Sequence, residues 1–452
     1  MAMADRYDLL LRGGTCLTPS GRATADVGVR NGRIAAIGDL AAAAAATVFD
    51  VAGLHVLPGV IDTQVHFREP GMEHKEDLES GTRGAVLGGV TGVFEMPNTS
   101  PNTDSKEALE DKLERAAGRA WCDHAFFVGA TTENAEQLGK LELLPGCCGV
   151  KIFMGSSTGN LLVADDVTLE RVLRNSRRRC AIHAEDEFRL RDRLTIAQEG
   201  GHPRFHPKWR DETAALNATQ RIVALARKTG HPVHVLHIST AEEMDFLAQH
   251  KDLATVEATP QHLTLAAPDC YEAIGTLAQM NPPIRDAKHR DGLWAALRAG
   301  IVDVIGSDHA PHTLKEKEAP YPRSPSGMPG VQTLVPIMLD HVSAGRLTLE
   351  RFVDLTSAGA QRIYGISGKG RLAVGYDADF TVVDLAAKRT ITNKWMASKA
   401  GWTPYDGKTV TGWPLATIIR GEIVMREDEL LGKPGGRPVR FTDTIPGEPR
   451  AA

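Results

Sequence analysis

The stretch GVIDTQVHFREPG, residues 59–71, passes from an apolar run into a polar segment. Gln64 and His66 are two residues apart, so on a strand their side chains leave the same face. Arg68 follows two residues later. The stretch therefore predicts a buried strand, ending at His66, that delivers polar side chains to one site.

Outward from this strand, short apolar runs alternate with amphipathic stretches between Leu57 and about Gly370. Seven further strands are expected at residues 92–96, 124–129, 149–153, 180–183, 233–237, 254–258 and 303–306. Helices are expected between them, among others at residues 105–117, 166–175, 211–228 and 288–299. Eight strand–helix units predict an α/β fold with a (β/α)8 TIM-type barrel.

The two ends of the chain have a different pattern, in which strands follow one another without long helices. Strands are expected at residues 7–12 and 27–37, the latter a hairpin around Asn31-Gly32, and again at 379–384 and 416–424. We expect residues 1–56 and 371–440 to form a small flanking β-sandwich domain, residues 57–370 the barrel, and 441–452 an extended tail. The alanine run 41–46 is expected to be a small helix or a surface connection.

Composition excludes several classes of protein. The 452 residues are 42% hydrophobic and 24% charged, which is an ordinary globular balance. A net charge of -5 disfavours a nucleic-acid-binding role, and no apolar run is long enough to span a membrane. The N-terminus lacks the apolar core of a signal peptide. Six scattered cysteines without a CxxC pair favour reduced thiols in a cytoplasmic protein.

Polar residues of one chemical kind lie at or near the ends of several expected strands. Lys151 is inside an apolar run, where an uncompensated ammonium is costly. His183 and His237 each close a short apolar strand, and Asp308 follows another. Taken singly, each has an ordinary explanation: a structural histidine, a lysine that reaches solvent, an aspartate that caps a helix. Together at one face of a barrel they predict a metal site, since imidazole and carboxylate are natural zinc ligands.

Seven motifs, in order along the chain, resemble those of class I dihydroorotases, in the dihydroorotase/hydantoinase branch of the amidohydrolase superfamily. They are HFREPGMEHKEDLESGT (66–82), FEMPNTSP (94–101), GVKIFMGSSTG (149–159), IHAEDE (182–187), HVLHIST (234–240), MNPPIRD (280–286) and GSDHAPH (306–312). The resemblance implies a metal-dependent barrel with a flanking β domain. It also implies the reversible cyclisation of N-carbamoyl-L-aspartate to L-dihydroorotate in pyrimidine biosynthesis.

The same resemblance implies a role for each site residue. Lys151, carboxylated to a carbamate, would bridge the metal ions, with His183 and His237 as ligands of one zinc and His66, Asp308 and residue 64 as ligands of the other. Asp308 would also be the catalytic base and acid, moving a proton between the attacking water and the ring nitrogen. Substrate contacts are implied for Arg68 and Asn98, which form a carboxylate clamp, and for Asn281 and His312.

Two positions depart from the family pattern. Gln64 stands where the family has histidine, and a neutral amide oxygen is a poorer zinc donor than imidazole. We therefore expect one or two zinc ions, with weaker binding on the Gln64 side. Gln261 replaces the first histidine of a Pro-His-His-Leu motif, and no role is assigned to it. The loop 313–328, rich in Lys, Glu and Pro, is expected to be either an active-site lid or a surface loop, and its length and position favour a mobile segment.

Three functions are compatible with these residues. The first is an active dihydroorotase with an altered metal centre. The second is a catalytically weak dihydroorotase-like partner of aspartate transcarbamoylase, disfavoured because only one ligand is changed. The third is a related cyclic amidase, such as allantoinase or dihydropyrimidinase, disfavoured because these lack the clamp of Arg68 and Asn98. A small-molecule substrate is expected, together with a homodimer or an association with the transcarbamoylase.

Overall fold

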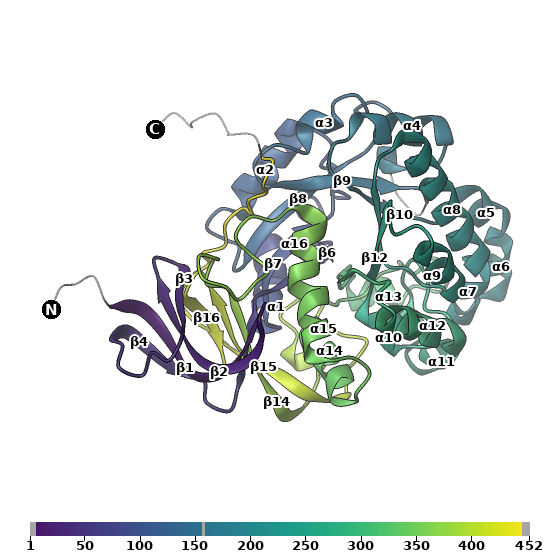
Figure 1. Ribbon diagram of the computed structural model, residues 1–452. Coiled ribbons are helices and arrows are strands. Elements are labelled where there is room, and N and C mark those ends of the chain that lie inside the picture. The colour runs from purple at the N-terminus through teal and green to yellow at the C-terminus, as the bar shows by residue number, and fades with distance from the viewer. Residues whose placement is uncertain (1–5, 156–158, 445–452) are drawn as a thin grey trace.

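A barrel of eight parallel strands forms the centre of the molecule in the computed structural model, which describes residues 6–155 and 159–444 (Figure 1). The strands are β6 (Val60–Val65), β7 (Val90–Glu95), β8 (Asp123–Gly129), β9 (Cys147–Phe153), β10 (Cys180–His183), β11 (Val233–Val235), β12 (Ala254–Ala258) and β13 (Val304–Ile305). They pair in chain order, and a parallel bridge between Val65 and His309 joins the last strand region to the first. The predicted (β/α)8 barrel is confirmed, with all eight strands near their expected positions.

Helices surround the barrel, and their starts follow from local sequence. The four expected helices are confirmed as α2 (Lys106–Ala116), α4 (Asp166–Asn175), α8 (Glu212–Thr229) and α12 (Ala287–Arg298). Each helix begins after an N-cap residue whose side chain accepts a hydrogen bond from a backbone N–H of the first turn. These N-cap residues are Ser105, Asp165, Asp211 and Asp286, respectively. Such N-caps satisfy amide groups that have no partner inside the helix, which fixes where the helix begins.

Both ends of the chain join in a second, mixed sheet of nine strands beside the barrel, where the purple and yellow ribbons meet (Figure 1). The strands are β1 (Tyr7–Thr18), β2 (Gly21–Arg30), β3 (Arg33–Gly38), β4 (Ala45–Asp50), β5 (His55–Pro58), β14 (Phe380–Thr390), β15 (Thr409–Ile419), β16 (Glu422–Arg426) and β17 (Glu429–Leu430). β5 pairs with β14, which links the two chain ends. The expected hairpin at Asn31-Gly32 is present, with φ of +52° and +71°, as a tight two-residue turn requires.

Two details of the expected organisation change. Residues 41–46 form a turn and the start of β4, so they are a connection and the alternative of a helix is wrong. Residues 441–444 of the expected tail pack against the barrel: Phe441 is buried beside Phe94, and Asp443 binds Arg178 at 2.5 Å. The remaining tail, residues 445–452, lies outside the described residues.

A buried lysine ties the two domains together. Lys369 lies within 2.6 Å of Asp123, at the start of β8, and within 2.5 Å and 3.3 Å of Asp379 and Asp377, just before β14. All six cysteines are buried and free of disulfides, as expected. None of the helices in the described ranges has the length and apolar character needed to cross a membrane.

Candidate active site at the carboxyl ends of the barrel strands

All ten side chains predicted to form the site line one cavity of about 270 Å³. They come from different strands: Gln64 is on β6, Lys151 on β9 and His183 on β10, while His237 and Asp308 follow β11 and β13. The carboxyl ends of parallel barrel strands meet at one face, so ligands far apart in sequence become neighbours. The remaining members of the cavity set are His66, Arg68, Asn98, Asn281 and His312.

The first pair of donors consists of two histidines. His183 Nδ1 and His237 Nε2 are 3.1 Å apart, close to the roughly 3.3 Å between two imidazole nitrogens on one tetrahedral zinc. On its far side, His183 Nε2 donates to Glu185 at 2.8 Å, which leaves Nδ1 free to face the cavity. Glu185 is held in turn by Arg210. Burial lowers the pKa of both histidines, so both rings are neutral, as metal binding requires.

The second group of donors combines an imidazole, a carboxylate and an amide. His66 Nε2 lies 3.1 Å from Asp308 Oδ1, and the Gln64 amide donates to the same oxygen at 3.0 Å. The other ring nitrogen of His66 donates to Asn98 Oδ1 at 2.7 Å. Burial lowers the pKa of His66, and a neutral ring that donates to Asn98 presents a lone pair to the Asp308 carboxylate. A cation between these two acceptors removes their repulsion.

Lys151 is the bridging candidate between these groups. Its side chain is 1% exposed, and its Nζ has no hydrogen-bond partner among the described residues. The nearest ring is that of Phe153, with its centroid 4.6 Å from Nζ. Burial lowers the pKa of Lys151 to about 7, so a neutral amine able to react with CO2 is accessible near neutral pH.

The donor set fits a metal centre built on a carboxylated lysine. Within residues 6–155 and 159–444, no three His, Cys, Asp or Glu side chains form a metal-binding group on their own. The donors divide instead into His183 with His237 and His66 with Asp308. A carbamate on Lys151, with one negative charge shared by its two oxygens, would add an anionic donor to this set. The Gln64 Oε1 atom, buried and without a partner in the described chain, is the further donor on the second side.

Three site residues adopt a backbone conformation that non-glycine residues rarely take. φ is +67° at Arg68, +35° at His237 and +46° at Asp308. Each such residue costs about 1–3 kcal/mol and persists only where surrounding structure enforces it. All three lie at turns just beyond a barrel strand, so the strain coincides with the residues predicted to do the chemistry.

Arg68 forms a cationic corner of the cavity. It is 7% exposed, and burial lowers its pKa to about 10, which leaves it charged near neutral pH. Its Nε donates to the Pro311 carbonyl at 3.2 Å, and Nη2 lies 3.3 Å from His312 Nε2. Lys75 donates to the other nitrogen of His312 at 3.1 Å. Among the described side chains, no carboxylate pairs with Arg68.

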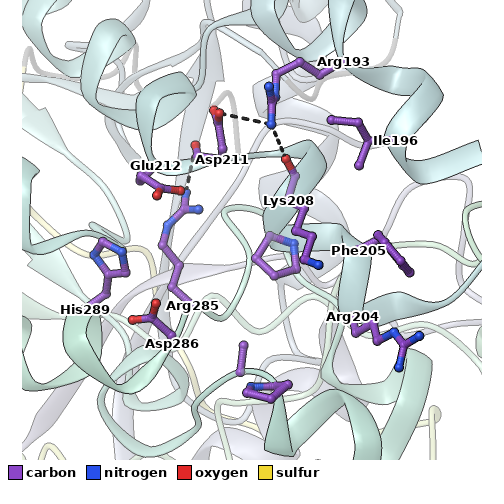
Figure 2. Close-up of a pocket in the computed structure, with 13 residues that line it drawn as sticks. Arg193, Ile196, Arg204, Phe205, Lys208, Asp211, Glu212, Arg285, Asp286 and His289 are labelled. Atoms are coloured by element: carbon purple, nitrogen blue, oxygen red, sulfur yellow. Dashed lines mark hydrogen bonds and ion pairs between the residues drawn. The ribbon is translucent and has the colours of Figure 1, made fainter. Parts of the chain in front are cut away.

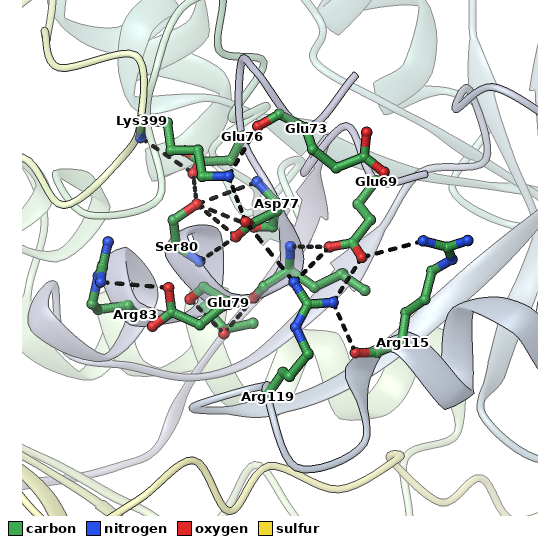
Figure 3. Close-up of polar contacts among 12 residues, drawn as sticks. Glu69, Glu73, Glu76, Asp77, Glu79, Ser80, Arg83, Arg115, Arg119 and Lys399 are labelled. Carbon is green, nitrogen blue, oxygen red and sulfur yellow. Dashed lines mark hydrogen bonds and ion pairs between the residues drawn. The ribbon is translucent and has the colours of Figure 1, made fainter. Parts of the chain in front are cut away.

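A polar network holds the segment that follows Arg68 (Figure 3). Glu69 accepts from Arg119 at 2.7 Å and from the backbone N–H of Leu78 at 3.0 Å. Asp77 caps α1 (Leu78–Leu87) and binds Lys399 at 2.5 Å. These contacts fix the turn on which Arg68 is presented to the cavity.

Sequence reasoning missed the residues that support the site. Glu185 lies two residues after His183 in the IHAEDE motif, a spacing that could have suggested a partner for that histidine. Arg210 and Lys75 had no such signal, because their contacts arise only in the folded chain.

A larger cavity, about 730 Å³, lies elsewhere and contains none of the ten site residues (Figure 2). Its buried Arg285 already donates to the Arg210 carbonyl at 2.9 Å and to Ser239 at 3.0 Å. The smaller cavity is the candidate active site because it gathers the strained residues and the unpartnered Lys151.

Comparison with known proteins agrees with this geometry. Residues 55–424 match the model of the Amidohydrolase family. The chain is 36% identical over 426 residues to a dihydroorotase of Methanosarcina mazei, covering 91% of this chain and 92% of that protein. It is also 36% identical over 449 residues to an allantoinase of Deinococcus radiodurans, covering 96% and 98%.

The same architecture occurs in solved structures. An L-hydantoinase (dihydropyrimidinase) from Arthrobacter aurescens superposes with a TM-score of 0.91 at 28% identity, covering 96% of this chain and 100% of that one. These relatives share a barrel and a flanking sheet but are named for different substrates. The chain belongs to the amidohydrolase family and is a hydrolase of cyclic amides.

Proposed function

We propose that this protein is a dihydroorotase, which interconverts L-dihydroorotate and N-carbamoyl-L-aspartate in pyrimidine biosynthesis. The observation that carries the proposal is Arg68. A buried guanidinium without an ion pair in the described chain calls for an anionic ligand. Dihydroorotate has a ring carboxylate that can accept two N–H bonds from an arginine fork.

Allantoin and dihydrouracil lack a carboxylate, so their binding would leave the Arg68 charge buried and unpaired. The similarity to the Deinococcus radiodurans allantoinase does not decide between these substrates, because the dihydroorotases match at equal identity. The chemistry of the cavity wall favours the substrate with a negative charge. Retention of every expected donor except the histidine at position 64 also favours an enzyme over an inactive partner of aspartate transcarbamoylase.

In this assignment Arg68 binds the substrate carboxylate, and Asn98 contributes to the same clamp while it orients His66. His312 extends the cationic corner, and Asn281, which accepts from His206 at 2.9 Å, is a further substrate contact. These residues fix the ring so that its amide lies toward Asp308. A fixed orientation lowers the entropic part of the barrier.

Asp308 moves the proton. In ring opening it accepts a proton from the attacking water and delivers it to the ring nitrogen as the amide C–N bond breaks. In cyclisation it runs the same transfer in reverse. Zinc would be held by His66, Lys151, His183, His237 and Asp308, with Gln64. When bound, it lowers the pKa of bound water and polarises the amide carbonyl.

The proposal is tested with a panel of cyclic amides on the metal-reconstituted protein. We expect kcat/KM for L-dihydroorotate to exceed that for allantoin, hydantoin and dihydrouracil by about 100-fold or more, since the buried charge is paired only by dihydroorotate. A preference for any of the uncharged substrates would refute the assignment and support a different cyclic amidase.

A further inference from the structure

The loop 313–328 forms one wall of the active-site cavity. It begins with the short helix α13 (Leu314–Lys317), and its last residues, Ser326 and Gly327, line the cavity. The wall also touches the cationic corner, because the Ser326 carbonyl lies 3.0 Å from His312 Nε2. The path of this segment therefore determines the shape of the substrate site next to Arg68.

Lys317 lies beneath this wall and is 1% exposed. Its Nζ donates to three backbone carbonyls: Pro325 at 2.8 Å, Gly327 at 3.0 Å and Gln279 at 3.3 Å. The Pro325 and Gly327 carbonyls flank Ser326 along the loop, and the Gln279 carbonyl precedes the Met280-Asn281 part of the site. Across the described ranges, no carboxylate pairs with this ammonium.

The arrangement uses the full donor capacity of an ammonium group, which has three N–H bonds and no acceptor. Burial lowers the pKa of Lys317 to about 7, and the three carbonyl oxygens are the acceptors that face its N–H bonds. The same carbonyls would point at one another with nothing between them if the ammonium were removed. A buried acceptor without a donor is costly, so the wall would rearrange.

Other contacts make this rearrangement local. The Gly327 amide donates to the Gln279 carbonyl at 2.8 Å, next to the ammonium. Gly327 has φ of +134°, and a Cβ there would lie 2.4 Å from the Ala310 carbonyl, so the wall is tightly packed against the turn that follows Asp308. The Lys317 carbonyl is itself fixed by Thr276 at 2.5 Å.

We propose that Lys317 is a positioning residue that gathers the Gln279, Pro325 and Gly327 carbonyls and so fixes the Ser326–Gly327 wall against which the substrate binds. In place of a mobile lid, the loop then acts as a preformed wall. The identity of the substrate in this inference rests on the proposed function. The role of Lys317 in fixing Ser326 and Gly327 does not depend on it.

The test compares Lys317→Met, which keeps the length of the side chain and removes its donors, with Lys315→Met, an exposed lysine on the same helix. Hydrogen exchange of the metal-reconstituted proteins, read in peptides covering 318–330, reports the wall without any substrate. We expect exchange there to rise about 10-fold or more in Lys317→Met, with barrel peptides 60–66 and 233–238 unchanged. Lys315→Met is expected to match the wild type.

Kinetics supply the second readout. We expect Lys317→Met to raise KM about 10-fold while kcat changes less than about threefold and metal content stays the same, because the metal donors are on other elements. Lys317→Arg keeps the charge, but a planar guanidinium does not fit among three converging carbonyls. It should therefore raise KM and the exchange of peptides 318–330 by smaller factors than Lys317→Met.

Two outcomes overturn the proposal: unchanged exchange in the wall of both Lys317 variants, or faster exchange throughout the barrel, which would mark a general structural role. If the wild type does not act on dihydroorotate, the exchange result still decides the role of Lys317. The kinetic comparison is then made with whichever cyclic amide the wild type hydrolyses.

Discussion

The two donor groups of the site are built unequally. His183 and His237 face each other as two imidazoles, and Glu185, held by Arg210, supports His183 from behind. On the opposite side, His66 lies directly against Asp308, the Gln64 amide donates to the same Asp308 oxygen, and the neutral Asn98 amide supports the histidine from behind. The first group has two strong donors and an anionic support, whereas the second has a neutral, weak donor in its third position.

This difference predicts that the glutamine at position 64 weakens metal binding on one side of the proposed centre while the other side retains it. Affinity for a metal depends on the ligands and on the groups that orient them. The side with His183 and His237 has both imidazole ligands and a carboxylate that orients His183. We therefore expect this side to bind metal first when metal is limiting. The second side depends more on the bridge that Lys151 would supply.

Removal of the bridge should have the largest effect. Lys151→Met deletes the side chain that would join the two donor groups, so we expect both groups to lose metal. We expect kcat/KM to fall about 1,000-fold or more. Metal analysis and turnover are measured beside Lys140→Met, an exposed lysine on another element. Full metal content in Lys151→Met would contradict the bridging role.

Arg68→Met should leave both donor groups intact and damage only substrate binding. We expect KM for dihydroorotate to rise about 100-fold, the loss of one buried charge-assisted contact, with metal content unchanged. The change should be absent for an uncharged cyclic amide, which serves as the internal control. An unchanged KM for dihydroorotate would remove Arg68 from the clamp.

Glu185→Gln tests the support behind the stronger group. An amide keeps the shape but removes the anion that accepts from His183 and pairs with Arg210, so metal affinity on this side should fall about 10–100-fold. Competition with a metal-binding dye measures the change. Glu187→Gln, two residues further along at the half-buried start of α5 (Glu187–Asp192), where Glu187 pairs with Arg191, is the matched control and should bind metal normally.

Gln64→His should have the smallest effect and the opposite sign. Imidazole in place of the amide gives the weaker group a stronger donor, so its metal affinity should rise about 10-fold and approach that of the His183 side. Elemental analysis under limiting metal is the measurement. Two tightly held metals in the wild type, unchanged in the variant, would show that Gln64 does not limit binding.

Much of this could be predicted from sequence because the barrel repeats one pattern. Strands and helices alternate around the barrel, and several of the helices begin after a recognisable N-cap residue. Polar residues at the strand ends must then meet at one face. Lys151 was recognisable because an ammonium in an apolar run needs an explanation. Arg210 and Lys317 were not recognisable, because Arg210 lies 25 residues from its partner Glu185 and the partners of Lys317 are backbone carbonyls, which leave no trace in a sequence pattern.

Turnover and metal content measured on one sample test the central claim most directly. Chelated protein is titrated with zinc while ring opening of L-dihydroorotate and ring closure of N-carbamoyl-L-aspartate are followed. We predict no turnover without metal and restored turnover in both directions as zinc binds, with the second equivalent bound more weakly than the first. Zinc-containing protein that converts neither compound would contradict the account.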